Sequence, residues 1–365
     1  MSSIIFINMR FLTQRITGVQ RFAFELCKAL DTLLMDANDL QIIALMPNRE
    51  INAQYTDYVF HNITIQPCGR FAGHIWEQFE LPFYSRGSLL INLCNTAPLV
   101  KFYQMITLHD VIFMTNLDSQ KWWFKAWYRV IAYVTSATAK HIFTVSQFSQ
   151  QEICRLLGCN IAKITVLGNA PKITNYPYKD DILHKFNLVS RPYYLMIGSN
   201  SARKNTQLVA ELFAQDPRCQ ELILVIAGGK YANLGEVSTI EASNIIYTNY
   251  IDDSALRCLY HHAQALLFPS LYEGFGIPLV EAMAESVPII AADIPVTHEV
   301  CAESALYFSA TDSQQLANYI LLLQTQPELR ERLIKNGLLR LDNYQWDKFA
   351  KIILAKLMLE TKEKE

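Results

Sequence analysis

The chain has 365 residues, of which 51% are hydrophobic and 18% charged, and its net charge is −2 at pH 7. At about 150 residues per domain this length predicts two domains, and the weakly acidic balance argues against a nucleic-acid-binding surface. The apolar runs fall short of the ~18 residues that span a bilayer. The 8 cysteines include no C-x-x-C pair, which favours buried free thiols over a disulfide or zinc framework.

The first half of the chain alternates short apolar strands with helices. Strands are predicted at 4–8, 40–46, 63–66, 89–93 and 104–108, and apolar residues spaced by three and four predict an amphipathic helix over 19–34. Gly18 precedes this helix, where it could bring backbone N–H groups near a phosphate or serve as an ordinary loop residue. His109 and Asp110 end the strand at 104–108, where ligands bind in open α/β sheets, although a structural histidine is the alternative.

Residues 118–136 interleave tryptophan, phenylalanine and tyrosine with Lys121, Lys125 and Arg129, whose spacing of four places them on one helical face. Two interpretations stay open. The helix is half buried with a solvated basic edge, or it lies at a membrane surface with its rings at the headgroup level and its cations on anionic lipid. Prolines at 171, 177 and 192 then indicate a linker.

The second half restarts the alternation with a predicted strand at 193–197, followed by Arg203 and Lys204 before a helix. Two cations in a strand-to-helix loop suit a diphosphate, since a guanidinium can bind it through two hydrogen bonds, although plain surface charge is the alternative. Further strands are predicted at 221–227 and 244–247. The acidic pairs 180–181 and 252–253 do not follow apolar strands as a D-x-D metal site would, and the second pair is predicted to begin a helix.

A strand at 265–268, a glycine-containing loop, a helix opened by Pro278 and a strand at 287–291 come next, before predicted helices at 312–323, 328–339 and 345–360. Proline in the first helical turn loses no needed hydrogen bond, and the free N–H groups of that turn can bind an anion. The loop carries Glu273 and the helix carries Glu281. The stretch therefore predicts a phosphate-bearing ligand held between two carboxylates.

The string PSLYEGFGIPLVEAMAESVPII, with its E-x7-E pattern, resembles the donor-site motif of retaining, two-domain glycosyltransferases of family four. TGVQRF, TLHDVIF, RKN and the tryptophan at 346 are similar to other segments of that family. The resemblance covers nearly the whole chain and is strongest over 198–300. Two departures are Glu285-Ser286, where the family often has a small pair, and Ala170, where the family usually has Asn-Gly-Val.

This resemblance implies an α/β fold of two doubly wound Rossmann-like domains facing a cleft, the arrangement called GT-B. Together with the alternation of strands and helices, it predicts an acceptor-side domain over 1–175, a nucleotide-sugar domain over 176–342, and a last helix over 343–365 that packs back on the first domain. The implied reaction transfers a hexose or deoxyhexose from a nucleotide-diphosphate sugar to a hydroxyl of a glycan or lipid-linked saccharide, with retention, in O-antigen, capsule or lipopolysaccharide synthesis.

The resemblance also implies residue roles. His109 would face the donor sugar, Glu273 would hold sugar hydroxyls, and Glu281 would take two ribose hydroxyls. The full predicted set is catalytic His109, Glu273, Arg203 and Lys204, with substrate-binding Gly18, Gly274, Phe275, Gly276 and Glu281.

No metal or other cofactor is expected, because the two cations and the helix end can meet the charge of the leaving diphosphate. A nucleotide-sugar epimerase of the same fold is an alternative, as is a non-catalytic nucleotide-sugar binder; an epimerase would need extra carboxylates as acid and base. The expected partners are a nucleotide-diphosphate sugar and a glycan or lipid-linked acceptor, without nucleic acid. Since no signal peptide precedes the first strand, a cytoplasmic location is expected, with possible peripheral contact with the inner membrane through residues 121–129.

Overall fold

The computed structural model describes residues 3–36, 40–115, 117, 121–172, 178–198, 201–228 and 240–362. The chain divides into two compact units, each with its own parallel sheet. Unit 1 comprises Met1–Met114, Trp123–Asn169 and Gln345–Glu365, and unit 2 comprises Thr115–Trp122 and Ala170–Tyr344. The boundary predicted near residue 175, and the proline at 177, lie outside the described residues.

Unit 1 is built on a seven-stranded sheet in the order β3-β2-β1-β4-β5-β6-β7. The strands are β1 (Ser3–Asn8), β2 (Leu40–Pro47), β3 (Ile63–Cys68), β4 (Leu89–Asn92), β5 (Gln104–Thr107), β6 (His141–Thr144) and β7 (Ile164–Val166). All neighbouring pairs are parallel. The residues of β4, β5 and β6 are buried throughout, as expected of parallel strands covered on both faces. Strands β1 to β3 are added toward one edge of the sheet and β4 to β7 toward the other. The point between β1 and β4, where the order reverses, is therefore a topological switch point.

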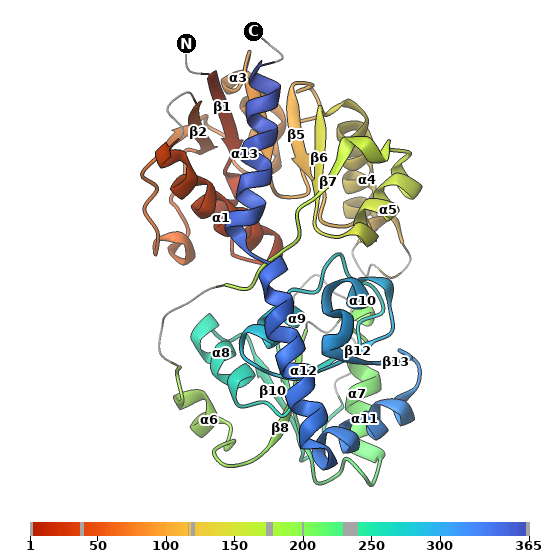
Figure 1. The fold of residues 1–365 in the computed structure, drawn as a ribbon. Coiled ribbons are helices and arrows are strands. Elements are labelled where there is room, and N and C mark those ends of the chain that lie inside the picture. Colours follow the sequence, from red (N-terminus) through yellow and green to blue (C-terminus); the bar gives the residue numbers. More distant parts are fainter. Residues whose placement is uncertain are drawn as a thin grey trace. The chain divides into compact units, whose positions relative to one another are not determined.

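The longer helices of unit 1 are α1 (Gly18–Leu33), α4 (Trp122–Thr138), α5 (Gln147–Leu157) and α13 (Trp346–Lys362). The chain returns from unit 2 as α13, which packs along α1 (Figure 1). At the start of α13 the Trp346 ring meets Phe22 of α1 edge-on, with centroids 5.7 Å apart. Gly168, after β7, has a φ of +105°, and a Cβ there would lie 2.7 Å from the Phe349 ring. Glycine therefore permits the close approach of α13.

A helical segment at 73–84 was not predicted from the sequence. It consists of α2 (Gly73–Ile75), the π-helical turn η4 (Trp76–Glu80) and α3 (Leu81–Tyr84). Trp76 is fully buried, whereas Phe79 and Phe83 are largely exposed. The short turns of unit 1 are η1 (Arg10–Thr13), η2 (Leu34–Asp36), η3 (Ala53–Tyr55), η5 (Ile112–Met114) and η6 (Ile161–Lys163).

Unit 2 has a six-stranded parallel sheet in the order β10-β9-β8-β11-β12-β13, so its switch point lies between β8 and β11. The strands are β8 (Tyr193–Ile197), β9 (Ile223–Ala227), β10 (Ile245–Asn249), β11 (Leu266–Phe268), β12 (Ile289–Ala292) and β13 (Ala305–Phe308). The helices are α6 (Asp181–Lys185), α7 (Thr206–Gln215), α8 (Asp253–His261), α9 (Ile277–Ala284), α10 (Pro295–Cys301), α11 (Ser313–Thr325) and α12 (Pro327–Arg340), with turns η7 (Ala202–Lys204), η8 (Ala302–Ser304) and η9 (Leu341–Asn343).

The predicted fold class, two doubly wound Rossmann-like sheets with interleaved helices, is confirmed. The prediction for β8 matches to the residue, and Asp252 does begin a helix, since its side chain accepts a 2.9 Å hydrogen bond from the Ala255 N–H at the start of α8. Helices α6 and α10 and strand β13 were not predicted from the sequence. All eight cysteines are free, as predicted. Among the described residues no helix has the length and apolar character needed to cross a bilayer.

Candidate active site

In unit 2 the predicted cations and the predicted acid form one group at the switch point. Arg203 and Lys204 lie in η7 after β8, and Glu273 lies in the loop after β11. The Glu273 Oε1 atom is 2.8 Å from Arg203 Nη1 and 2.6 Å from Lys204 Nζ. The Leu271 N–H donates a 2.8 Å hydrogen bond to the Arg203 carbonyl, which ties the two loops together. The two strands that flank the switch point thus bring these three side chains into contact.

The charges in this group are strongly coupled. Burial alone would raise the pKa of Glu273, but Lys204 and Arg203 outweigh it and lower that pKa to about 2. The pKa of Lys204 is lowered by burial, an effect that Glu273 opposes. Glu273 is therefore a carboxylate at neutral pH. Two cations face one anion, so the group has an excess positive charge that suits an anionic ligand.

The helix α9 begins immediately beyond this group. Its N-cap is Gly276, with a φ of +94°, and a Cβ at this position would lie 2.8 Å from Leu279 Cδ1. The left-handed backbone and the close packing both require glycine. Pro278 is the second residue of the helix and has no N–H, and the Leu279 N–H donates a 2.9 Å hydrogen bond to the Gly276 carbonyl. The N-terminus of α9 still has the positive end of the helix dipole, which favours an anion. Gly274 is buried, and Phe275 packs edge-on against Tyr344 with centroids 5.3 Å apart.

Glu281 lies one turn into α9 and has a partner that the sequence analysis did not find. Its Oε2 atom accepts a 2.9 Å hydrogen bond from the Tyr260 hydroxyl of α8. Burial raises the pKa of Tyr260 well above its ordinary value, so this hydroxyl stays a donor. No local motif links residues 21 positions apart, so only the packing of α8 against α9 reveals the pair. Tyr260 fixes the orientation of the Glu281 carboxylate.

The departure at Glu285-Ser286 has a structural explanation. Ser286 has a φ of +58°, so it adopts the left-handed conformation that glycine often supplies after a helix. Glu285 accepts hydrogen bonds from Arg257 Nε at 2.5 Å and from the Tyr178 hydroxyl at 3.0 Å. Its carboxylate also lies 3.7 Å from His261 Nδ1. The fold thus brings an acid that is distant in sequence to His261.

In unit 1 the predicted histidine lies in a rigid setting after β5. The backbone N–H of His109 donates a hydrogen bond to Asn95 Oδ1 at 2.7 Å, and the ring Nε2 atom lies 3.0 Å from the Leu93 carbonyl oxygen. A carbonyl can only accept, so Nε2 carries the proton and Nδ1 has the free lone pair. Burial lowers the pKa of His109 to about 4, which keeps the imidazole neutral at pH 7. The ring also meets Phe22 of α1 edge-on, four residues after Gly18.

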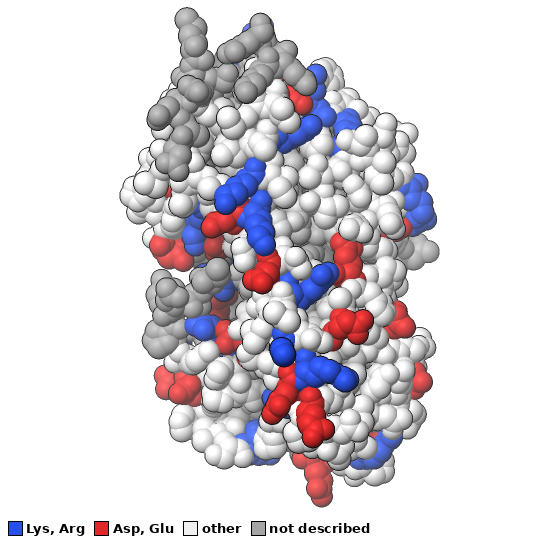
Figure 2. All heavy atoms as spheres, viewed as in Figure 1, with Lys and Arg blue, Asp and Glu red and all other residues white. Residues whose placement is uncertain are grey.

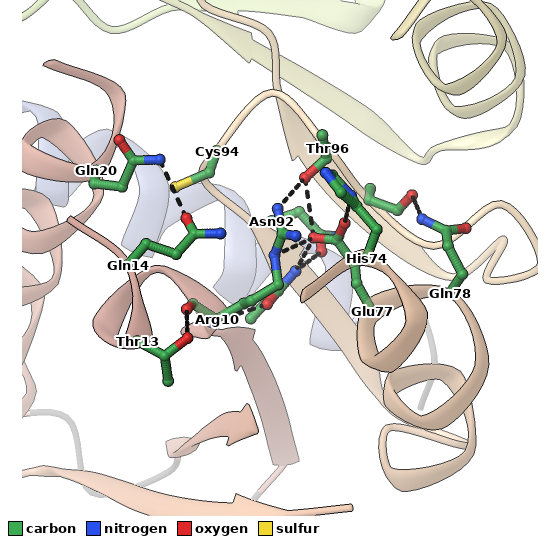
Figure 3. Close-up of polar contacts among 12 residues, drawn as sticks. Arg10, Thr13, Gln14, Gln20, His74, Glu77, Gln78, Asn92, Cys94 and Thr96 are labelled. Carbon is green, nitrogen blue, oxygen red and sulfur yellow. Dashed lines mark hydrogen bonds and ion pairs between the residues drawn. The ribbon is translucent and has the colours of Figure 1, made fainter. Parts of the chain in front are cut away.

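A buried polar network that the sequence analysis missed lies at the switch point of unit 1 (Figure 3). We call it the Glu77 cluster: Asn8, Arg10, His74, Glu77, Asn92 and Thr96. The Glu77 Oε1 atom accepts from Asn8 Nδ2 at 2.9 Å and from the Thr96 hydroxyl at 3.0 Å, and lies 3.4 Å from Arg10 Nε. The cluster lies where β1 and β4 end. Its members come from separate segments of the chain, so no sequence motif predicts that they lie together.

The aromatic helix α4 matches neither open interpretation entirely. Trp122 and Trp123 are 79% and 55% exposed, whereas Trp127 and Tyr128 are half buried. The basic edge is not wholly solvated, because Arg129 Nε donates a 3.1 Å hydrogen bond to the Phe113 carbonyl. On the face seen in Figure 2, basic and acidic side chains are interspersed.

A metal ion could be held at one place among the described residues. Asp180, Cys258 and His262 have ligand atoms that all lie within 4.8 Å of one another, and the Cys258 thiol donates to Asp180 at 3.5 Å. These residues lie beside α6 and on α8, and none belongs to the group around Glu273. The absence of a catalytic metal stays a prediction.

Comparison with known proteins shows what the chain is similar to. The family described as "Glycosyl transferases group 1" matches residues 179–340, which lie within unit 2. The O-antigen chain mannosyltransferase RfbU of Salmonella typhimurium is 28% identical over 252 residues, which cover 68% of each chain. The family match and this relative support the interpretation of the chain as a group 1 glycosyltransferase. The O-antigen chain mannosyltransferase B of Escherichia coli is 29% identical over 222 residues, only 58% of each chain. The structure of Anabaena HepE with UDP-glucose has a TM-score of 0.72, at 16% identity, and covers 98% of this chain and 99% of that one.

This glycosyltransferase holds its predicted site residues in two sets. In unit 2, Arg203, Lys204 and Glu273 are in direct contact, and the glycine loop leads from them to Glu281 on α9. In unit 1, the N-terminus of α1 begins at Gly18, and His109 follows β5. Within each unit the set lies on loops or helix ends that follow strands, where doubly wound folds bind their ligands.

Proposed function

We propose that this glycosyltransferase moves a hexose or deoxyhexose from a nucleotide-diphosphate sugar to a hydroxyl of a glycan or lipid-linked saccharide. The contact of Arg203, Lys204 and Glu273 at the switch point of unit 2 carries the proposal. An excess positive charge beside a helix N-terminus suits a diphosphate. Glu281, oriented by Tyr260, is placed on α9 to accept hydrogen bonds from two ribose hydroxyls.

The proposed chemistry is transfer with retention, which the resemblance to family four implies. As the bond between the anomeric carbon and the diphosphate breaks, negative charge develops on the leaving oxygen. Arg203, Lys204 and the first turn of α9 would meet that charge. The leaving oxygen would accept the proton of the acceptor hydroxyl while the new carbon–oxygen bond forms on the same face. The neutral His109, with its free lone pair on Nδ1, would accept a hydrogen bond from a sugar hydroxyl.

Mannose or a related sugar is the donor sugar we propose, with a role in O-antigen or a similar surface polysaccharide. Support comes from two relatives that are named as O-antigen chain mannosyltransferases. The solved HepE complex contains UDP-glucose, so UDP sugars are among the donors to test. A cytoplasmic location fits the eight free thiols, which a reducing compartment preserves.

Two other functions would use the same donor-binding residues. An epimerase needs a free acid and a free base at the sugar, but Glu273 is bound to two cations and Glu281 to a tyrosine hydroxyl. A non-catalytic binder would hold the nucleotide sugar without turnover. We therefore favour the transferase.

A two-stage experiment tests the proposal. The purified chain is first screened by thermal shift with GDP, UDP, dTDP and ADP sugars, since a ligand that binds the folded state raises its stability. The best donor is then incubated with acceptor saccharides, and the products are examined by NMR. A glycoside with the anomeric configuration of the donor is expected. An inverted glycoside would refute retention, and a free epimer or an unchanged donor would refute transfer.

A further inference from the structure

One member of the Glu77 cluster differs from the others. Glu77 is 1% exposed, and Asn8, Asn92 and Thr96 are also buried, but the His74 side chain is 38% exposed. The His74 Nδ1 atom lies 3.3 Å from Glu77 Oε2. The cluster therefore has one half-exposed imidazole above a buried layer of polar side chains. It lies at the switch point, where doubly wound sheets bind ligands.

The partners of Glu77 determine which nitrogen of His74 is available. Burial raises the pKa of Glu77, but Arg10, His74 and Asn8 outweigh it and hold that pKa below its ordinary value. The side chain is thus a carboxylate, which can only accept hydrogen bonds. His74 must donate from Nδ1, so in the neutral ring Nε2 carries the lone pair. Glu77 acts as the positioning residue that fixes this tautomer.

Aromatic rings of α4 lie beside the imidazole. The His74 ring centroid is 6.2 Å from that of Trp127 and 6.3 Å from that of Tyr128, and both rings are close to perpendicular to it. Tyr128 is stacked on Phe124 with centroids 4.2 Å apart, which holds it in place. A small set of polar atoms beside aromatic surface is the usual composition of a small-molecule site.

The charge of the cluster indicates the class of ligand. Arg10 is matched by Glu77 at 3.4 Å and also donates to the Thr96 hydroxyl at 3.1 Å. The buried cation and the buried anion cancel, unlike the excess positive charge of Arg203 and Lys204. The site therefore suits neutral hydroxyls rather than a phosphate.

We propose that His74, Trp127 and Tyr128 form the subsite for the terminal sugar of a saccharide acceptor. His74 Nε2 accepts a hydrogen bond from a hydroxyl of that sugar, and the rings contact its apolar C–H face. The inference rests on the proposed function, because it names the acceptor class of the same reaction. It goes further in assigning this binding to His74, Trp127 and Tyr128.

The test measures saccharide binding to the full chain directly. Saturation-transfer NMR is recorded with the methyl glycosides of mannose, rhamnose, galactose and N-acetylglucosamine, and with inorganic phosphate as competitor. At least one glycoside should bind. His74→Ala and Trp127→Ala should each weaken its binding about tenfold, whereas His61→Ala, which removes an exposed histidine of the same unit, should leave it unchanged. His74→Gln keeps an acceptor atom and should lose less than His74→Ala.

Several results would overturn the proposal: no glycoside binds the wild-type chain, phosphate displaces the glycoside, or His74→Ala binds as well as wild type. Folding is checked by thermal unfolding, and Glu77 keeps Arg10, Asn8 and Thr96 as partners in the His74 variants. Nucleotide-sugar binding is measured on the same samples. If the wild type binds no nucleotide sugar, the proposed function fails; if it does, and the glycoside results are negative, only the acceptor subsite fails.

Discussion

Replacing Glu273 by Gln isolates the charge of the carboxylate that holds the two cations of unit 2. The substitution keeps the shape of the side chain but removes its charge, so Lys204, whose side chain is 12% exposed, faces Arg203 with no anion between them. Removing one partner of a buried ion pair destabilises a protein by about 3–5 kcal/mol. We therefore expect Glu273→Gln to lower the free energy of unfolding by roughly 3 kcal/mol at pH 7.

The pKa of Glu273 gives an independent magnitude and a pH window. It falls from an ordinary value of 4.5 to about 2 in the folded chain. At 1.36 kcal/mol per unit, this shift corresponds to about 3 kcal/mol. Because the folded pKa is the lower one, this stabilisation is present above pH 4.5 and is lost as the pH falls toward 2. Glu273→Gln should therefore be clearly less stable than wild type at pH 7, and the gap should narrow at pH 3.

Urea unfolding at pH 7 and pH 3 measures both effects, with circular dichroism as the signal. Glu281→Gln is the matched control, because that carboxylate is hydrogen-bonded to the neutral Tyr260 hydroxyl and its loss should change stability by about 1 kcal/mol. Equal stability of Glu273→Gln and wild type at pH 7 would refute the reasoning. So would an undiminished gap at pH 3.

Three further predictions concern activity and location. Turnover should survive excess EDTA, since protein cations meet the leaving diphosphate; loss that Mg²⁺ or Mn²⁺ restores would contradict this. Glu281→Ala should mainly weaken nucleotide binding and Glu273→Ala should mainly lower kcat, whereas equal effects on both parameters would contradict the division of roles. The chain should co-sediment with anionic but not neutral liposomes, and changing Lys121 and Lys125 to Glu should abolish this binding; Arg129 is left intact, because its main-chain hydrogen bond supports the fold.

How much the sequence predicts differs between the two units for physical reasons. In unit 2 the buried parallel strands are short apolar runs, and the site residues follow them closely in sequence, so β8 and the positions of Arg203 and Glu273 in loops after strands could be anticipated. Their direct contact was not predicted. Tyr260 could not, because its hydrogen bond to Glu281 depends on how two helices pack. Helix α10 and strand β13 were missed for a different reason, because each is too short to show a periodic pattern.

In unit 1 the obstacle was the segment at 73–84. Its apolar positions at 75, 79 and 83 recur at a helical spacing, yet they face outward, and a π-helical turn interrupts the regular period. The polar residues His74 and Glu77 look like the solvated face of such a helix. In the structure Glu77 is buried and His74 half-exposed, because Asn8 and Asn92 at two strand ends provide partners.

The two polar groups of the enzyme differ in charge balance, and under the proposed function this difference would separate the two substrates. In unit 2, two cations share one carboxylate, so a diphosphate would complete the neutralisation and would be bound by charge. In unit 1, one cation is already matched by Glu77, so a further anion would gain little there, whereas a hydroxyl can bind His74 without disturbing the pair. Exchange of these roles would leave a phosphate facing Glu77 and a neutral sugar facing an excess of positive charge. The charge balance thus favours donor binding in unit 2 and acceptor binding in unit 1.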